Sequence, residues 1–118
     1  IRGQSSVLSR HVNHPQSGEN WIQVPSITGK MLLDEINLPE IDLIKIDVEG
    51  LTYEVLKSFG EDLNKLKFLH LEVETIEFWN QQKLYQDVVQ YLTNRGFEEV
   101  YNNKHEWELQ FDSFWKRK

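Results

Sequence analysis

The sequence predicts an α/β fold in which strands and helices alternate along one domain and end in an antiparallel β-hairpin. Two observations predict it. An apolar, β-branched run at 41–48 and a second apolar run at 68–74 are each followed by a stretch with helical periodicity. Such alternation is typical of a parallel sheet with helices on its faces. The chain has 118 residues and no linker-like stretch, so we expect residues 1–118 to form a single domain.

The first forty residues predict one strand and one helix. Residues 1–20 are polar and rich in turn-forming residues, so we expect a loop or a short strand there. Residues 21–24 form a strand candidate, which the following proline ends. Helical spacing of apolar residues begins at Thr28, which with Ser26 is a candidate N-cap, and Pro39 stops this helix.

The central stretch predicts a strand–helix–strand unit. Residues 41–48 form the first strand, a sharp turn follows at Gly50, and a helix is expected over 51–59. Residues 61–66 predict a short helical turn, and the second strand follows at 68–74.

The last forty residues predict a helix and a hairpin. The helix is expected over 80–95, where apolar side chains fall on one face. Strands are expected over 97–101 and 106–115, and Asn102-Asn103 is the hairpin turn signal between them.

The composition argues against several function classes. Its 13 Lys and Arg against 19 Asp and Glu leave a formal net charge of −6, whereas a nucleic-acid backbone binder carries a basic excess. The absence of cysteine excludes disulfides, thiolate nucleophiles and cysteine-ligated zinc. No apolar window approaches the length of a membrane-spanning helix, and no signal-peptide pattern opens the chain. We therefore expect no nucleic-acid or membrane partner and take the cytoplasm as the default compartment.

Four carboxylates follow the two central strands. Asp47 and Glu49 end the first strand candidate, and Glu72 and Glu74 end the second. Ligands bind beyond the carboxyl ends of the strands in an open parallel sheet, so neighbouring strands would bring these acids to one rim. Such a cluster could raise the pKa of one acid and supply a general base, or bind a divalent cation through oxygen. Acids at strand ends also cap the next helix or face water, which is the structural alternative.

Other polar and aromatic side chains have structural interpretations. Lys45, within a strand, is expected to form an ion pair or to extend to the sheet edge. His70 is expected to be a hydrogen-bonded core histidine, whereas His11 and His14 are expected in a solvated turn. Three tryptophans are expected to be packing residues: Trp79, Trp107 and Trp115.

A longer motif includes the first pair of acids. Residues 42–50 read Asp-Leu-Ile-Lys-Ile-Asp-Val-Glu-Gly and continue into Tyr-Glu-Val-Leu-Lys at 53–57, and Leu-Glu-Val-Glu follows at 71–74. Together they resemble the strand, helix and second strand that mark the FkbM-type S-adenosylmethionine-dependent methyltransferases. Residues 5–8 and 24–35 resemble this family's upstream segments, so the resemblance covers more than half of the chain.

The resemblance implies a fold, a cofactor and a site. The fold would be a Rossmann-like class I methyltransferase sheet, of which the present strands resemble the fourth to the seventh. The cofactor would be S-adenosylmethionine, and the methyl acceptor a hydroxyl of a sugar or another small molecule. Asp47 and Glu49 would be the catalytic residues, which orient or deprotonate that hydroxyl.

The resemblance also has a departure. The family's glycine-rich first strand–turn and its ribose-binding acid have no counterpart in this chain, which begins at Ile1. The cofactor-binding residues are therefore unknown, and we expect the C-terminal half of such a domain. We expect this isolated chain to be inactive and to bind S-adenosylmethionine weakly. An open sheet edge would favour a homodimer.

Two other functions are compatible with these residues. A non-catalytic α/β interaction domain that lacks the cofactor half could use the same scaffold. A carboxylate–metal hydrolase could use Asp47, Glu49, Glu72 and Glu74 as ligands, and tight binding of magnesium or manganese would favour it.

Overall fold

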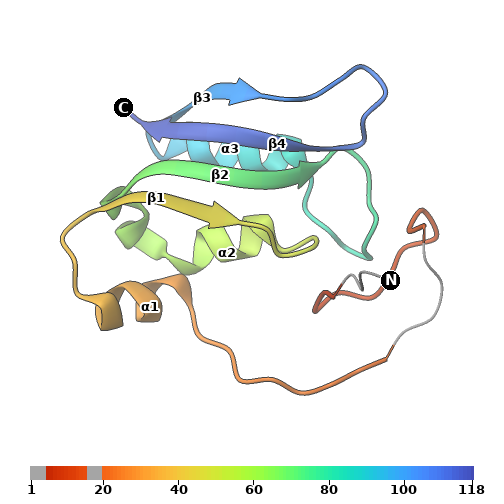
Figure 1. The fold of residues 1–118 in the computed structure, drawn as a ribbon, viewed down its shortest axis with the longest axis horizontal. Helices are drawn as coiled ribbons and strands as arrows, with labels where there is room; N and C mark the ends of the chain where they lie inside the picture. The colour runs from red at the N-terminus through yellow and green to blue at the C-terminus, as the bar shows by residue number, and fades with distance from the viewer. Residues whose placement is uncertain (1–4, 16–19) are drawn as a thin grey trace.

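A four-stranded sheet organises the part of the chain that the structure, a computed structural model, describes: residues 5–15 and 20–118 (Figure 1). The helices α2 and α3 lie behind this sheet in Figure 1 and leave its other face open. The elements in chain order are α1 (Gly29–Ile36), β1 (Ile41–Ile46), α2 (Thr52–Ser58), the 3-10 helix η1 (Gly60–Lys65), β2 (Leu66–Glu74), α3 (Tyr85–Asn94), β3 (Phe97–Asn102) and β4 (Gln110–Arg117).

The sheet is mixed, with the strand order β1-β2-β4-β3. β1 and β2 run parallel, as the intervening helix α2 requires, and Ile46 pairs with Leu71. β4 runs antiparallel to both β2 and β3. The predictions of an α/β fold and of a terminal antiparallel strand pair are confirmed. Because β1 and β2 are adjacent and parallel, their carboxyl ends share one edge of the sheet.

The core lies between the sheet and the helices, and strand alternation explains it. On β2, Leu69, Leu71 and Val73 are buried toward the helices, whereas the residues between them are partly exposed on the open face. α2 and α3 contribute Leu56 and Leu92, which are completely buried. The sheet therefore has one packed face and one face that presents the side chains of the candidate site.

Helix α1 begins as the sequence predicts. Thr28 is its N-cap, and its hydroxyl accepts a hydrogen bond of 3.1 Å from the Met31 backbone N–H. The helix ends at Ile36, and Asn37 follows in the left-handed conformation at φ 55°.

The predicted strand at 21–24 is wrong. These residues form no regular secondary structure and lie outside the sheet, and Trp21 and Ile22 are 64% and 84% exposed. A strand needs a partner for its backbone groups, which the apolar pattern of four residues does not provide. Within residues 5–15, Arg10 forms an isolated antiparallel bridge with Trp79. The rest of the predicted N-terminal loop, residues 1–4 and 16–19, lies outside the described residues.

The helix predicted over 80–95 begins later, at Tyr85. The preceding loop is held by Gln82, whose side-chain oxygen accepts hydrogen bonds from the backbone N–H groups of Phe78 and Trp79 at 3.0 and 3.2 Å. Asp87 then fixes the start of the helix, because its carboxylate accepts the Leu84 N–H at 2.8 Å. Side-chain caps of this kind override the apolar periodicity.

The predicted hairpin turn and the start of the last strand are also wrong. β4 begins at Gln110 rather than at residue 106, and residues 103–109 form a longer connection. The side chain of Asn103 accepts the Asp112 N–H at 2.7 Å, in a position where a strand partner would otherwise bond. Trp107 is consequently 80% exposed and is not a packing residue, unlike Trp79 and Trp115.

Among the residues described, no helix is both long enough and apolar enough to span a membrane.

Candidate functional site

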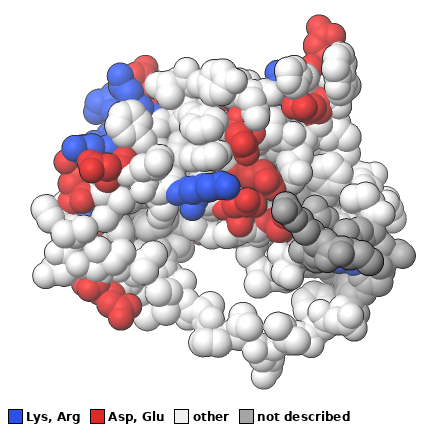
Figure 2. Space-filling view, in the orientation of Figure 1, with Lys and Arg blue, Asp and Glu red and all other residues white. Residues whose placement is uncertain are grey.

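Three carboxylates converge where the carboxyl ends of the parallel strands β1 and β2 meet. One oxygen each from Asp47, Glu49 and Glu72 lies within 4.8 Å of the others. Figure 2 shows acidic side chains gathered beside a basic one near the middle of the open face. The sequence prediction that acids from both strand ends meet at one rim is confirmed for these three. Glu74 lies outside the group of three and is only 3% exposed.

A turn brings Asp47 and Glu49 to the rim, and strand alternation does not. β1 ends at Ile46, and Glu49 and Gly50 both have positive φ angles, of 47° and 97°. The ring of Trp79 packs against Gly50 so closely that an added Cβ would lie 2.5 Å from its Cδ1 atom. Glycine is therefore required at position 50 both by conformation and by space. The contact between Trp79 and Gly50 holds the backbone of the turn and so determines the direction of the Glu49 side chain.

The N-terminal segment also contacts the turn after β1 and the loop that carries Trp79. The Ser6 hydroxyl donates a hydrogen bond of 2.5 Å to the backbone carbonyl of Glu49, 43 residues away. Asn80 donates its backbone N–H to the Ser9 carbonyl at 2.7 Å. The His14 ring lies edge-on to Trp79, with 4.6 Å between ring centroids. His14 is therefore part of the support of the site. The expected turn is present, because the His14 backbone N–H donates to the His11 carbonyl at 2.9 Å, but His14 is partly buried and not fully solvated.

Two glutamines that sequence reasoning missed hold the second pair of acids. Gln110 Nε2 donates to Glu72 Oε1 at 2.7 Å and to Glu74 Oε1 at 2.9 Å. Gln82 Nε2 donates to the other oxygen of Glu74 at 2.5 Å. Both oxygens of Glu74 are thus engaged, which explains how its carboxyl group is buried. Only the pairing of β4 with β2, which places Gln110 opposite Glu74, could have identified Gln110.

Burial and mutual repulsion raise the pKa values of these acids. The pKa of Glu72 is raised to about 7, first by burial and then by the charges of Asp47 and Glu49. Burial also raises the pKa of Glu49, with the charge of Asp47 adding to it. Burial raises the pKa of Glu74 as well, although the hydrogen bond from Gln110 opposes this. The rim therefore holds a carboxyl group that exchanges a proton near neutral pH, which is the property of a general acid or base.

Lys45 and His70 lie on the same open face. The Lys45 ammonium lies 3.7 Å from Asp47 Oδ2, so the predicted ion pair is confirmed. His70 Nε2 lies 3.4 Å from Asp112 Oδ2, and its ring stacks on Phe114 at a centroid distance of 4.2 Å. The side chain of His70 is 22% exposed, so the expectation of a core histidine is wrong.

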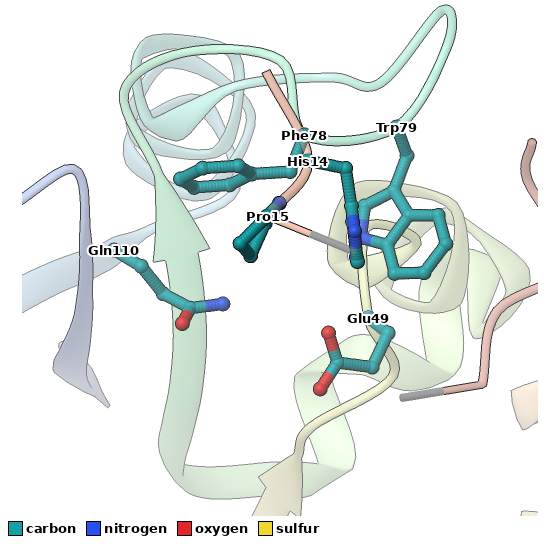
Figure 3. A pocket seen from close by; sticks show the side chains of 6 residues that line it. All are labelled: His14, Pro15, Glu49, Phe78, Trp79 and Gln110. Carbon is teal, nitrogen blue, oxygen red and sulfur yellow. The ribbon is translucent and has the colours of Figure 1, made fainter. Parts of the chain in front are cut away.

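A small pocket opens beside the carboxylates (Figure 3). Its cavity volume is about 60 Å³, far below the roughly 300 Å³ at which small-ligand sites begin, so it admits a small group such as a hydroxyl. The side chains of Glu49 and Gln110 point into it, and apolar side chains form much of its wall. The pocket is lined by His14, Pro15, Glu49, Phe78, Trp79 and Gln110. Its chemistry combines hydrogen-bonding groups with apolar walls.

The donor set of the rim suits cationic or hydroxyl groups. Three carboxylates are the ligands that hard divalent cations prefer, and they also complement the positive sulfonium of S-adenosylmethionine. The rim therefore fits the reactive end of that cofactor, whereas no glycine of the chain forms the G-x-G pattern typical of nucleotide-binding turns. The catalytic roles of Asp47 and Glu49, and the metal roles of Glu72 and Glu74, stay predictions.

Comparisons with known proteins identify the family of the chain. The profile described as "Methyltransferase FkbM domain" matches residues 2–99, which is more than half of the chain. The chain is 29% identical over 73 residues to the hexuronic acid methyltransferase AglP of Haloferax volcanii, which is 62% of this chain but only 30% of that relative's length. No solved structure matches. The chain therefore belongs to the FkbM methyltransferase domain family.

Proposed function

We propose that the protein transfers a methyl group from S-adenosylmethionine to a hydroxyl oxygen of a sugar or another small metabolite. The observation that carries this proposal is the position of Glu49, whose carboxylate faces a pocket beside Asp47 and Glu72 at the carboxyl ends of two parallel strands. Family membership supports methyltransferase chemistry and the use of S-adenosylmethionine. The chain covers less than a third of the curated relative, so the activity of the whole protein is part of the proposal.

We extend the proposal to the arrangement of the sheet. In a class I methyltransferase sheet, β1, β2, β3 and β4 would correspond to the fourth, fifth, sixth and seventh strands. The strand order β1-β2-β4-β3 and the antiparallel direction of β4 support this assignment. The outer edge of β1 would then face the cofactor-binding strands.

The proposed chemistry is an attack by the acceptor oxygen. When bound, S-adenosylmethionine supplies an electrophilic methyl group on a cationic sulfur. The acceptor hydroxyl would lie in the pocket, where Glu49 and Asp47 orient its O–H bond. As the new oxygen–carbon bond forms, the hydroxyl proton passes to a rim carboxylate, and the electron pair of the broken bond remains on sulfur. Glu49 lines the pocket and is therefore the nearer of the two acids to such a hydroxyl.

The experiment that tests this proposal uses the full protein, methyl-labelled S-adenosylmethionine and a panel of glycosides and small alcohols. We expect the label to appear in an ether, which resists mild base. Failure to label any hydroxyl compound would contradict the proposal. A product that loses its label in mild base would indicate a methyl ester, and therefore a carboxyl acceptor instead of a hydroxyl.

A further inference from the structure

We propose that residues 5–15 form a strap that opens by local unfolding to admit the methyl acceptor and then closes over it. The opening itself is independent of the proposed function, whereas the role of the strap as a gate for the acceptor rests on that function. Three features of the molecule support the inference: the size of the closed pocket, the contacts of the strap and the connection that follows it.

The closed pocket is too small for the compound that carries the hydroxyl. Its cavity volume of about 60 Å³ accommodates a hydroxyl but not a sugar ring. Two of its six lining residues, His14 and Pro15, belong to the strap (Figure 3). The other four belong to the turn after β1, the loop after β2 and the start of β4. Movement of the strap would therefore remove one wall and widen the pocket while the sheet stays in place.

The apolar side chains of the strap do not enter the core. None of residues 5–15 is buried, and Val7 and Val12 are 65% and 92% exposed. Apolar burial is the main source of the free energy that holds a segment in place, and segments without it open at much lower cost than global unfolding. The strap is therefore able to open while the core between the sheet and the helices remains folded.

Hydrogen bonds to the loop after β2 hold the strap closed. The His11 N–H donates to the Phe78 carbonyl at 2.8 Å, and the Asn80 N–H donates to the Ser9 carbonyl at 2.7 Å. The side-chain amide of Asn80 also donates to Ser9 Oγ at 2.8 Å and to the Arg10 carbonyl at 3.2 Å. Because water replaces these bonds when the strap opens, their net contribution is modest. Asn80 is the residue on which the closed position depends most.

Closure connects the strap to the catalytic candidate Glu49. In the closed state the Ser6 hydroxyl donates to the Glu49 carbonyl, and the His14 ring lies edge-on to Trp79. Both contacts are lost when the strap lifts, so the turn that carries Glu49 is fully supported only after closure. The strap thus admits the acceptor when it is open and completes the site when it is closed.

The connection that follows leaves the strap room to move. Residues 20–28 are all exposed and form no regular secondary structure. Figure 1 shows this connection running to α1 at a distance from the sheet. Exposed connections of this kind are the mobile parts of a fold, and they place little restraint on the segments that they join.

Hydrogen exchange of the full protein, followed by NMR, tests the opening. We expect the His11 and Asn80 amides to exchange about 100-fold faster than the amide of Leu71 in β2, with little dependence on low urea. The N80A variant should raise exchange at His11 about tenfold, because it removes two hydrogen bonds to the strap. The matched control is N64A, at an exposed asparagine of η1, which should leave it unchanged. Exchange of His11 and Asn80 only by global unfolding would overturn the inference.

An engineered disulfide tests the gate. The isolated bridge of Arg10 with Trp79 makes Ser9 and Asn80 the next opposed pair, with their Cα atoms about 5.5 Å apart, so S9C/N80C can be bridged. This chain has no cysteine, and any others in the full protein would be replaced by serine. We expect oxidation to slow exchange at His11 and to lower methyl transfer about tenfold or more, and reduction to reverse both effects. The protein without the two new cysteines should respond to neither treatment.

The two experiments separate this inference from the proposed function. Equal rates of methyl transfer in the oxidised and the reduced variant would overturn the gate. The absence of transfer in both states would sink the proposed function. Hydrogen exchange at His11 and Asn80 would then decide the inference, since it reports the opening of the strap without any methyl acceptor.

Discussion

Glu72 connects the stability of the protein to the chemistry of its rim. Its carboxyl group lies among Asp47, Glu49, Glu74 and Asp112, and burial together with these charges raises its pKa to about 7 from an ordinary value of 4.5. Ionisation of Glu72 in this position lowers the free energy of unfolding. The hydrogen bond that Gln110 donates to the carboxyl group offsets part of this loss. An acid that has a raised pKa and is held by a hydrogen bond beside a pocket is typical of a functional position.

This shift predicts that the protein becomes less stable as the pH rises from 4.5 to about 7. In that range the folded protein holds a proton on Glu72 that the unfolded chain has lost, so the free energy of unfolding falls with pH. After allowing for solvent screening, we expect Glu72 to account for about 1 kcal/mol of this fall. Urea unfolding at pH 5 and pH 8 should show a smaller fall for E72Q than for the unchanged protein. An E72Q variant with the same pH dependence as an E54Q control would contradict the assignment.

At the residue scale, the sequence predicts the acids but not the residues that hold them. Asp47, Glu49 and Glu72 follow β-branched runs, and the rule that ligands bind at strand ends points to them. Gln110 and Ser6 reach the rim through contacts 38 and 43 residues away in sequence, which no local pattern encodes. The predicted strand order is enough to predict that the acids meet at one rim. It does not predict the register of β4, which places Gln110 opposite Glu74.

The turn after β1 is the element on which the site depends. Its two positive φ angles and the Trp79 ring against Gly50 leave little freedom to Glu49. Trp79 itself is 3% exposed and belongs to the loop between β2 and α3. The position of the catalytic candidate is therefore determined jointly by two loops and the N-terminal segment.

Two glycine substitutions separate conformational strain from loss of space. Gly60 has a φ of 57° and no atom within 4 Å of an added Cβ, so G60A should cost only about 1 kcal/mol of strain. G50A adds a clash with Trp79 to similar strain and should cost about 2–4 kcal/mol. Urea denaturation of both variants measures the difference. Equal losses would mean that the Trp79 contact does not constrain the turn.

At the element scale, the predictions succeed where long-range packing and local pattern agree. The strand–helix–strand unit around 41–74 is correct to within a few residues, because buried runs and helical spacing are both strong there. The predictions fail at 21–24 and at 106–109, where an apolar pattern lacks a strand partner. The late start of α3 has a different cause, since Asp87 and Gln82 hold the preceding residues in a loop.

For the whole molecule, the outer edge of β1 is the feature with the largest consequence. β1 is an end strand of the sheet, and exposed apolar residues accompany it, with Leu43 60% and Met31 55% exposed. Open strand edges with apolar neighbours promote association. The homodimer expected through this edge concerns the 118-residue chain, because the proposed cofactor-binding strands would lie there in the full protein. It stays a prediction, as does the compartment in which the protein works.

Sedimentation equilibrium tests the association of the 118-residue chain. We expect the apparent mass to rise with concentration, and L43K to shift the chain toward the monomer because it places a charge beside the edge. The matched control is V100K, a substitution at a 51% exposed residue of β3 at the opposite edge of the sheet. A monomer at every concentration, or equal effects of the two lysines, would contradict association through β1.

The most direct test of the central claim is the rate of methyl transfer by the full protein and its D47A, E49A and E54A variants. If the rim acids orient and deprotonate the acceptor, D47A and E49A should each lose about 100-fold or more of turnover while remaining folded. E54A, an exposed acid on α2, should stay within about twofold of the unchanged protein. Unchanged turnover in folded D47A and E49A would remove both residues from the reaction.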